Sequence, residues 1–370
     1  MNKTKAILTF LVALAMLIAA FSVPVVAVEE SPQSEYLVDK TVSETISITP
    51  SGMTGDDFWY LTDSGLRVGM EHGHFATDDL GYGFRRPDDS AYEHLAVAWY
   101  GEGFTVGYGG GSTIAYSYEG SPYYSGWTGV AYTNNVFSDR EEYVWSGNVG
   151  DLKVTQTAIV YKAEHDVALR IKIKNNGSTT ISDARYKRIV DWDIDYDVYN
   201  YWDYFTLPDG AEFQVATGRT LHLGDVYHQA AVVVPGGGCS KPATLHDQYG
   251  WEDMYWSTTV TQPDYNCTLI DGNALFQWNF SLAPDEEYDI VLFYLVDNAT
   301  NCTDTANIKA DYDELFRKIC KPRLTKTLDP EEGGLGTVVN VTIDIVTVGA
   351  GENVTVVDTL PSEFTYINGT

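Results

Sequence analysis

The chain has 370 residues, with 23 Lys and Arg against 52 Asp and Glu, so its formal net charge is −29 and its pI is about 4.3. A chain this acidic lacks the basic face that nucleic-acid binding requires. Its content of 44% hydrophobic and 13% aromatic residues excludes intrinsic disorder. The length allows roughly two domains, each with a core of its own.

The N-terminus has the pattern of a signal peptide. Two lysines precede an apolar stretch at residues 6–21, and Pro24 and Ala27 mark a cleavage region. An uncleaved anchor is the alternative, because about 23 apolar residues could span a bilayer. We expect residues 1–27 to be removed, leaving a secreted chain without a membrane span and with a flexible leader at residues 28–35.

Cysteines and asparagines also point to export. The even number of cysteines predicts two disulfides in an oxidising compartment, formed by Cys239, Cys267, Cys302 and Cys320. After the predicted signal peptide, eight asparagines open an N-x-[ST] sequon, and seven of them fall in the last 105 residues. These predicted N-glycosylation sites are Asn176, Asn266, Asn279, Asn298, Asn301, Asn340, Asn353 and Asn368. Together they predict a glycosylated cell-surface protein.

Residues 36–320 read as one large all-β domain, an antiparallel β-sandwich with wide sheets and one C-terminal helix. Short runs rich in Val, Tyr, Trp, Thr and Ile alternate with Gly, Pro, Asn and Asp. The clearest predicted strands are Leu152–Tyr161, Val167–Lys174, Tyr186–Val198, Ala211–Thr217, Val226–Val234, Ala274–Leu282 and Tyr288–Val296. So many strands without intervening helices predict a sandwich larger than one immunoglobulin-like unit.

Asn176-Gly177 predicts a β-hairpin. The dipeptide favours a type I′ turn, and the flanking segments both alternate between apolar and charged residues. In the register set by a two-residue loop, Val167 faces Tyr186 and Leu169 faces Ala184. The pattern therefore predicts that these two strands are neighbours in one sheet.

Residues Thr303–Ile319 predict the helix, with apolar positions recurring at helical spacing. Thr303 or Asp304 suits its N-terminus. A Cys302–Cys320 disulfide would need a helix of only about 11 residues, because a longer one separates its ends too far. Cys239–Cys267 is the easier pair, because this disulfide would close a loop at residues 235–266 that is bounded by Gly and Pro. The connectivity stays open at this point.

Residues 321–370 begin a second β unit. Its signature is Leu-Thr-Lys-Thr at 324–327, an alternating strand at Val339–Val348, and Asn-Val-Thr-Val-Val-Asp-Thr-Leu-Pro at 353–361. This stretch resembles the repeat called domain of unknown function eleven, found in tandem on prokaryotic cell-surface proteins. The resemblance implies an immunoglobulin-like fold, which needs about 100 residues and seven strands. We therefore expect an incomplete repeat, cut from a longer protein.

Residues 36–320 more faintly resemble the large β domain that precedes such repeats, and the supersandwich modules attached to carbohydrate-active enzymes. The resemblance rests on Lys-Ile-Lys-Asn-Asn-Gly at 172–177, on Arg-Tyr-Lys-Arg-Ile-Val-Asp-Trp-Asp-Ile at 185–194, and on the strand and helix at 288–319. It implies a supersandwich-like fold and brings no assigned active site with it.

Four acidic residues alternate along one predicted strand, at Asp191, Asp193, Asp195 and Asp197. Because like charges in such a row repel, a calcium ion could bridge them. The competing interpretation is a solvated face that pairs with nearby Arg and Lys residues, including Arg170, Lys172, Arg185 and Lys187. Calcium is the one cofactor that the sequence suggests.

Two further groups of polar residues have a structural and a functional interpretation. Arg188 falls on the apolar side of its strand, where it needs a carboxylate or carbonyl partner or else serves in binding. His72 and His74 could offer two imidazoles to a metal, or could be ordinary surface or loop histidines.

Residues 99–132 combine many aromatic residues with glycines. Exposed rings on a β surface can stack on sugars, whereas buried rings would be sandwich core. The candidate sugar-binding residues are Tyr116, Tyr118, Tyr123, Tyr124 and Trp127.

Three hypotheses for function follow. The first is a structural or adhesive surface glycoprotein without catalytic activity, whose partners are the cell envelope or other surface proteins. The second is a carbohydrate-binding module that holds polysaccharide on the aromatic surface. The third is a glycan-active enzyme with a carboxylate pair, but the many acidic residues single out no pair.

Overall fold

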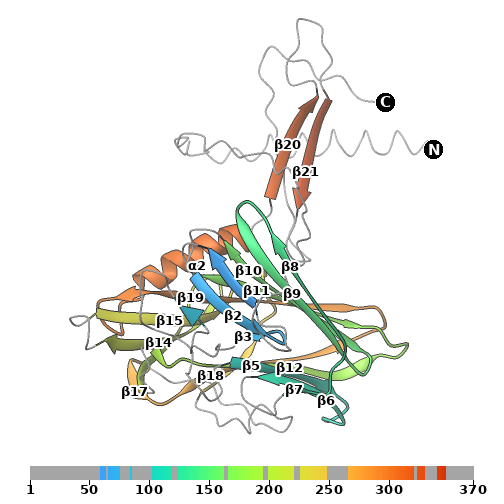
Figure 1. Ribbon diagram of the computed structural model, residues 1–370, viewed down its shortest axis with the longest axis horizontal. Helices are drawn as coiled ribbons and strands as arrows, with labels where there is room; N and C mark the ends of the chain where they lie inside the picture. The colour runs from blue at the N-terminus through green and yellow to red at the C-terminus, as the bar shows by residue number, and fades with distance from the viewer. Residues whose placement is uncertain are drawn as a thin grey trace, which may run out of the picture. The chain divides into compact units, whose positions relative to one another are not determined.

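The protein is all-β, with antiparallel sheets and one helix in the part of the chain that the structure describes. A computed structural model describes residues 59–63, 66–75, 84–85, 102–118, 124–161, 166–194, 199–220, 226–247, 266–320, 323–329 and 340–346. Two large sheets form a β-sandwich (Figure 1). The predicted fold class is confirmed.

The larger sheet has nine strands. From edge to edge they are β17 (Thr268–Ile270), β13 (Asn200–Thr206), β14 (Glu212–Thr220), β15 (Val226–Val234), β19 (Glu287–Ala299), β11 (Val167–Asn175), β10 (Leu152–Tyr161), β9 (Arg140–Val149) and β8 (Thr128–Val136). Every described pairing in it is antiparallel. Because antiparallel neighbours need no helical crossovers, the sequence can run as strands and turns.

The second sheet has six strands. Their order is β16 (Thr244–Asp247), β18 (Asn273–Leu282), β12 (Ile181–Asp191), β5 (Glu102–Tyr108), β6 (Thr113–Tyr118) and β7 (Tyr124–Ser125). A smaller sheet contains β1 (Trp59–Asp63), β2 (Leu66–Glu71), β3 (His74–Phe75) and β4 (Phe84–Arg85). Two further strands, β20 (Arg323–Asp329) and β21 (Asn340–Val346), pair antiparallel with each other.

The main core lies between the two large sheets. Alternate residues of each strand point into it, among them Trp145 and Leu292 from the nine-stranded sheet and Tyr186 and Trp278 from the six-stranded sheet. At about 25 cal/mol per Å² of buried apolar surface, such large side chains supply most of the driving force for folding. The two-residue alternation in the sequence records which face of each strand is inward.

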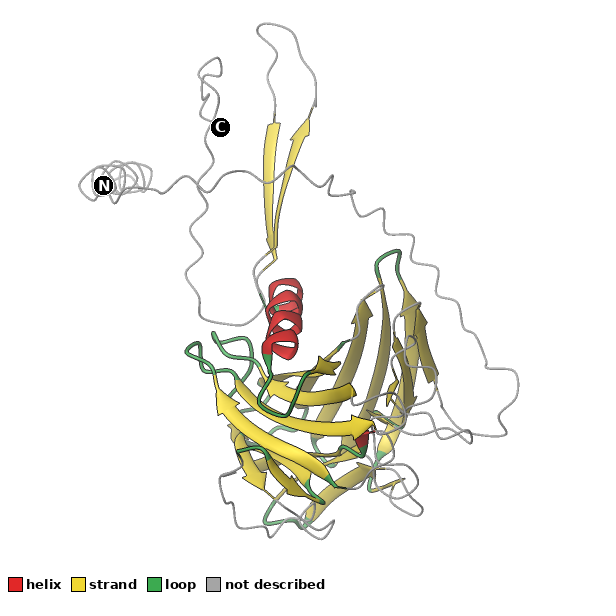
Figure 2. Cartoon of the chain, turned by 90° about the vertical axis from the view of Figure 1, so that its left-hand side faces the viewer, coloured by secondary structure: helices red, strands yellow, loops and turns green. Residues whose placement is uncertain are grey.

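Helix α2 (Ala306–Ile319) covers the outer face of the nine-stranded sheet and creates a second core (Figure 2). Its buried residues are Ile308, Tyr312, Leu315 and Ile319, which confirms the predicted apolar stripe. The helix begins three residues later than Thr303, because a turn precedes it in which the Asp304 N–H donates to the Asn301 carbonyl at 3.1 Å.

The hairpin prediction was wrong. β11 pairs with β10 and β19, whereas β12 pairs with β18 and β5 in the opposite sheet. The connection crosses from one sheet to the other. The Asn175 side chain holds it, donating to the Thr179 and Leu282 carbonyls at 2.8 and 3.0 Å and accepting from the Gly177 N–H at 2.9 Å. Strands that face each other across a sandwich have the same alternation as strands that pair side by side.

Both pairs of cysteines form disulfides, as predicted, but the favoured pairing was wrong. The bonds are Cys239–Cys320 and Cys267–Cys302, with Cα atoms 5.2 and 5.6 Å apart. The 14-residue helix separates Cys302 from Cys320 by about 21 Å along its axis, too far for one bond. Cys302 and Cys320, which flank the helix, bond instead to Cys267 and Cys239. The folded sheets place each of these partners beside the corresponding end of the helix.

The positions of the strands were predicted well. β10 and β15 have the predicted bounds, and β11, β14, β18 and β19 differ from the prediction by a few residues. β12 is shifted, because it ends at Asp191 instead of continuing to Val198. The signal peptide, the leader and Asn353–Thr370 lie outside the described residues, and none of the described helices is long and apolar enough to cross a membrane.

Candidate functional site

A cluster of buried polar residues lies between the two sheets, and it contains the residue that the sequence flagged as out of place, Arg188. Arg188 is on β12 and Glu102 is on the neighbouring strand β5. The register sets Arg188 opposite Phe104 and Glu102 opposite Val190, so the two charges are diagonal neighbours on the inner face. Both side chains are fully buried. The structural interpretation of Arg188, a buried Arg paired with a carboxylate, is confirmed.

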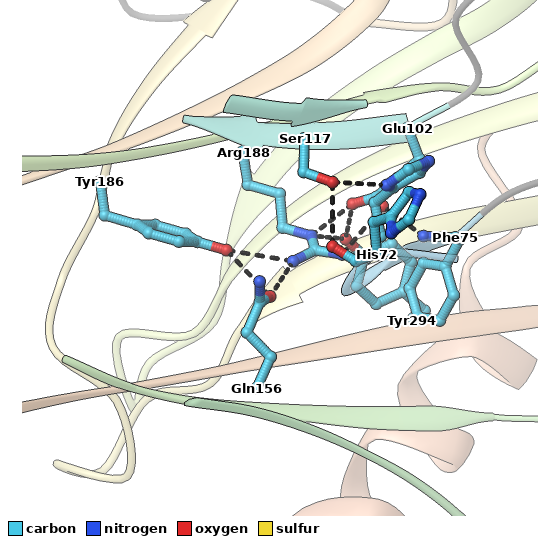
Figure 3. Close-up of polar contacts among 9 residues, drawn as sticks. His72, Phe75, Glu102, Ser117, Gln156, Tyr186, Arg188 and Tyr294 are labelled. Atoms are coloured by element: carbon cyan, nitrogen blue, oxygen red, sulfur yellow. Dashed lines mark hydrogen bonds and ion pairs between the residues drawn. The ribbon is translucent and has the colours of Figure 1, made fainter. Parts of the chain in front are cut away.

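The Glu102 carboxylate accepts hydrogen bonds from several donors (Figure 3). Arg188 donates to it from Nε and from Nη2, the latter at 2.8 Å. The Tyr294 hydroxyl donates to Oε1 at 2.8 Å, and the Phe75 N–H donates to Oε2 at 2.7 Å. Because all these contacts are donors, they favour the ionised form of the carboxylate.

The nine-stranded sheet supplies the other half of the cluster. Gln156 on β10 accepts from Arg188 Nη1 at 2.5 Å and from the Tyr186 hydroxyl at 3.2 Å. Tyr294 on β19 accepts from Arg188 Nε at 2.7 Å. The guanidinium also lies 5.6 Å from the centroids of the Phe75 and Phe104 rings. The polar cluster therefore ties the two sheets together through one arginine.

The charge of this cluster is set by the ion pair. Burial lowers the pKa of Arg188, but Glu102, Tyr294 and Tyr186 together raise it by more, so the guanidinium stays protonated. Burial raises the pKa of Glu102, and Arg188 and the Phe75 N–H oppose that shift. Burial raises the pKa of the Tyr294 hydroxyl well above its usual range. The tyrosines are therefore neutral hydrogen-bonding partners.

His74 lies beside this cluster, at the end of a tight turn. His72 and Gly73 both have positive φ, 46° and 83°, and a Cβ on Gly73 would come within 2.8 Å of the Trp145 ring. The Ser117 hydroxyl donates to the His72 carbonyl at 2.9 Å and lies 2.9 Å from His74 Nδ1. Because that hydroxyl proton is already used, His74 Nδ1 is the donor to Ser117.

This direction of hydrogen bonding does not suit nucleophilic catalysis. A serine nucleophile gives its proton to the histidine, whereas here the histidine donates to the serine. Both side chains are also buried, and His74 Nε2 has no partner within the described structure. Burial lowers the pKa of His74 well below its usual value, with further lowering by His72 and Arg188, so the ring is neutral. Glu102, Arg188 and His74 are therefore all buried inside the protein.

His72 and His74 have different neighbours in the structure. The turn separates them: His74 points at Ser117, while the His72 ring stacks on Tyr124 with centroids 4.0 Å apart. The expectation that both are surface or loop histidines was wrong for His74, which is 1% exposed. His74 is buried because β3 packs against β5 and β6, where its Nδ1 meets the Ser117 hydroxyl.

The row of aspartates extends past the end of its strand. β12 ends at Asp191, and Asp195 and Asp197 lie outside the described residues. Of the cations expected to pair with the row, Lys172 binds Glu287, Arg170 donates to the Ile319 carbonyl and Arg185 donates to Asn279 Oδ1. No group of three possible metal ligands gathers among the residues that the structure describes. Calcium binding by the full row stays a prediction.

Among the described aromatic rings of residues 99–132, Trp127 and Tyr124 pack against other rings of the protein, whereas Tyr132 is 45% exposed. Trp127 packs edge-on against Trp145, with centroids 4.9 Å apart, and its Nε1 donates to the Tyr116 carbonyl at 3.1 Å. Tyr116, Tyr124 and Trp127 are all partly buried. The side chains of Tyr118 and Tyr123 lie outside the described structure. These contacts favour the packing interpretation over a sugar-binding surface.

The described sequon asparagines are all on the surface. The side chains of Asn176, Asn266, Asn279, Asn298 and Asn301 are exposed. Asn340 begins β21, and its side chain, like Asn353 and Asn368, is outside the described structure. Exposure at every described sequon is the condition that N-glycosylation requires.

Glu102 is the residue that sequence reasoning missed. Its signal was available, because Glu102, Phe104 and Val106 alternate along one strand and share the inward face. A glutamate on an apolar face needs a cationic partner just as Arg188 needs an anionic one. Finding the pair would have required matching two strands that are 86 residues apart in the chain.

Comparison with known proteins identifies no family. No family model and no curated protein matches the chain. Among solved structures it is similar to a protein from the human microbiome described as a kojibiose phosphorylase, with 9% identity, a TM-score of 0.37, and coverage of 70% of this chain and 32% of that one. It is also similar to a polysaccharide lyase, with 11% identity, a TM-score of 0.29, and coverage of 68% and 36%.

A third similar structure is the family 36 α-galactosidase of Geobacillus stearothermophilus with stachyose bound. It has 13% identity and a TM-score of 0.34, and the match covers 71% of this chain and 43% of the enzyme. The chain thus spans between about a third and two fifths of the length of these proteins. At such values the likenesses assign neither an activity nor a substrate to this chain.

Proposed function

We propose that this chain is an exported, glycosylated cell-surface protein whose β-sandwich is a rigid, non-catalytic platform. The observation that carries the proposal is the exposure of every sequon asparagine whose side chain is described. These asparagines lie on several separate elements, including the β11–β12 connection, β18 and the segment before α2. Sugars could therefore be attached without disturbing the core.

Two other features support a durable exported platform. Both disulfides join the ends of the α2 region to the large sheet, and disulfides of this kind persist in oxidising compartments. The buried polar cluster around Glu102 and Arg188 is enclosed in the core. Groups enclosed in this way stabilise a fold and do not meet a substrate.

The repeat-like C-terminal segment supplies the proposed arrangement on the cell surface. β20 and β21 pair antiparallel, as strands of an immunoglobulin-like repeat would. In the proposed arrangement, residues 321–370 begin a stalk of such repeats, and the sandwich of residues 36–320 is the displayed head. Its partners would be the cell envelope or neighbouring surface proteins.

Glycopeptide mass spectrometry tests the proposal directly. The full chain is produced in a host that exports and N-glycosylates proteins, and the mature chain should begin at Val28. Carbohydrate is expected on the five exposed sequon asparagines and absent from Asn307, which is exposed but opens no sequon. An unmodified, full-length chain retained inside the cell would contradict the proposal.

A further inference from the structure

The Cys267–Cys302 disulfide joins the middle residues of two glycosylation sequons. The tripeptides are Asn266-Cys267-Thr268 and Asn301-Cys302-Thr303. The other disulfide, Cys239–Cys320, has no sequon at either cysteine. One bond therefore connects two acceptor tripeptides at their centres.

This connection places the two acceptor asparagines close together. The cysteine Cα atoms are 5.6 Å apart, and each asparagine is one residue away, so the Cα atoms of Asn266 and Asn301 are at most about 13 Å apart. Both asparagine side chains are exposed. Two bulky sugars would therefore flank a single disulfide.

The bond also constrains the backbone of both tripeptides. Cys267 has φ of 53°, in the left-handed region that side chains other than glycine rarely adopt. In the other tripeptide, Asn301 Oδ1 accepts from the Thr303 N–H at 2.9 Å and from the Thr303 hydroxyl at 2.7 Å. Once the disulfide has formed, the enzyme that adds the sugar must bind one tripeptide while the other tripeptide is attached to it.

The two modifications use different residues of the same two tripeptides, the asparagine for the sugar and the cysteine for the disulfide. In glycosylation, Asn Nδ2 forms a bond to the anomeric carbon of an activated glycosyl phosphate, the bond from that carbon to the phosphate oxygen breaks, and Nδ2 loses a proton. In oxidation, the two thiols lose two protons and two electrons to a disulfide oxidant, which is reduced to two thiols. The second reaction closes the site at which the first must act.

We propose that glycosylation of Asn266 and Asn301 competes with formation of the Cys267–Cys302 disulfide. Sugar is added to these two asparagines only while the thiols are free. This inference rests on the proposed glycosylation of the chain. It distinguishes the two sequons from Asn279, which has no cysteine in its tripeptide and is exposed on β18.

The test compares sequon occupancy in three full-length chains produced in the same exporting, glycosylating host. They are the wild type, the Cys267→Ala/Cys302→Ala variant and the Cys239→Ala/Cys320→Ala variant. Both altered sequons become Asn-Ala-Thr, the tripeptide already present at Asn298. Occupancy at Asn266 and Asn301 is measured by glycopeptide mass spectrometry and divided by occupancy at Asn279.

The occupancies of Asn266 and Asn301, each divided by that of Asn279, are expected to be below one in the wild type. Both ratios should rise at least about two-fold in Cys267→Ala/Cys302→Ala. They should stay at the wild-type value in Cys239→Ala/Cys320→Ala, which controls for the general effect of losing a disulfide. Full occupancy at both sites in the wild type, or the same ratios in all three chains, would overturn the competition alone. A chain without sugar even at Asn279 would overturn the proposed glycosylation and this inference with it.

Discussion

Arg188 and Asp191 are three residues apart on β12, and both bring a charge into the protein, but their surroundings differ. Arg188 faces the main core and is bonded to Glu102, Gln156 and two tyrosine hydroxyls. Asp191 is at the end of the strand, and its buried Oδ1 has no hydrogen-bond partner within the described structure. Its charged neighbours are carboxylates, Asp193 and Asp271.

The contrast shows that burial alone does not decide how much a charged side chain destabilises the fold. A buried charge with an opposite partner keeps its ionised form, because the partner replaces the lost hydration. A buried carboxylate near other carboxylates has no such compensation. Burial therefore raises the pKa of Asp191 well above its usual range, and Asp193 and Asp271 raise it further. One strand thus carries a buried charge with an opposite partner and a buried charge whose charged neighbours have the same sign.

Breaking the ion pair should have the largest effect. Arg188→Met leaves Glu102 buried without its cation, and we expect it to lower the free energy of unfolding by about 3–5 kcal/mol. Denaturant unfolding followed by tryptophan fluorescence measures the change. The matched control is Lys172→Met, which removes the exposed Lys172–Glu287 ion pair and should cost no more than about 1 kcal/mol. Equal losses in the two variants would contradict the structural role of Arg188.

His74 provides a second test, through the dependence of the protein's stability on pH. Its pKa is lowered in the folded chain, so the unfolded chain binds the proton more readily once the pH falls below about 6.5. Stability should therefore fall as the solution is acidified from pH 7 to pH 5. His74→Gln removes this contribution, and we expect the acid-induced loss to shrink by up to about 2 kcal/mol. Parallel stability curves for the two chains would show that His74 does not titrate in this way.

Substitution of Asp191 should change the free energy of unfolding least. The pH dependence that Asp191 contributes should have the opposite sign to that of His74. Because its folded pKa is raised, its contribution to stability is present at low pH and is lost as the pH rises through the folded pKa. Asp191→Asn keeps the shape and removes the charge, so it should stabilise the protein by about 1 kcal/mol at pH 7. The gain should disappear near pH 4. A loss of stability at pH 7 in the presence of EDTA would refute the account of Asp191.

The inward faces of the strands could be predicted, but their partners could not. The alternation of Val167, Leu169, Ile171 and Ile173 marks the buried side of β11 correctly. The same alternation in β12 led to a hairpin that does not exist, because residues on opposite sheets of a sandwich meet in the core just as cross-strand neighbours do. The alternation of apolar residues along a strand shows which side chains are buried. It does not show which strand is the hydrogen-bonded neighbour in the sheet.

The candidate site shows the same limit. The need of Arg188 for a partner follows from its position on an apolar face, yet Glu102 lies 86 residues earlier in the chain. The disulfides depend in the same way on contacts that only the folded sheets create. Local features with local causes, such as the buried stripe of α2, were predicted with their residues. Long-range pairing of charges and cysteines required the fold.

The central claim is that Glu102 and Arg188 form a buried structural pair on neighbouring strands of the six-stranded sheet, from which Arg188 also contacts Gln156 and Tyr294 of the other sheet. A double-mutant cycle of Glu102→Leu and Arg188→Met tests it most directly. The double variant should lose less free energy of unfolding than the two single variants added together, by at least about 2 kcal/mol, because removing both charges leaves neither unpaired. Losses that add to within about 0.5 kcal/mol would show that the two charges act independently, and would contradict the account.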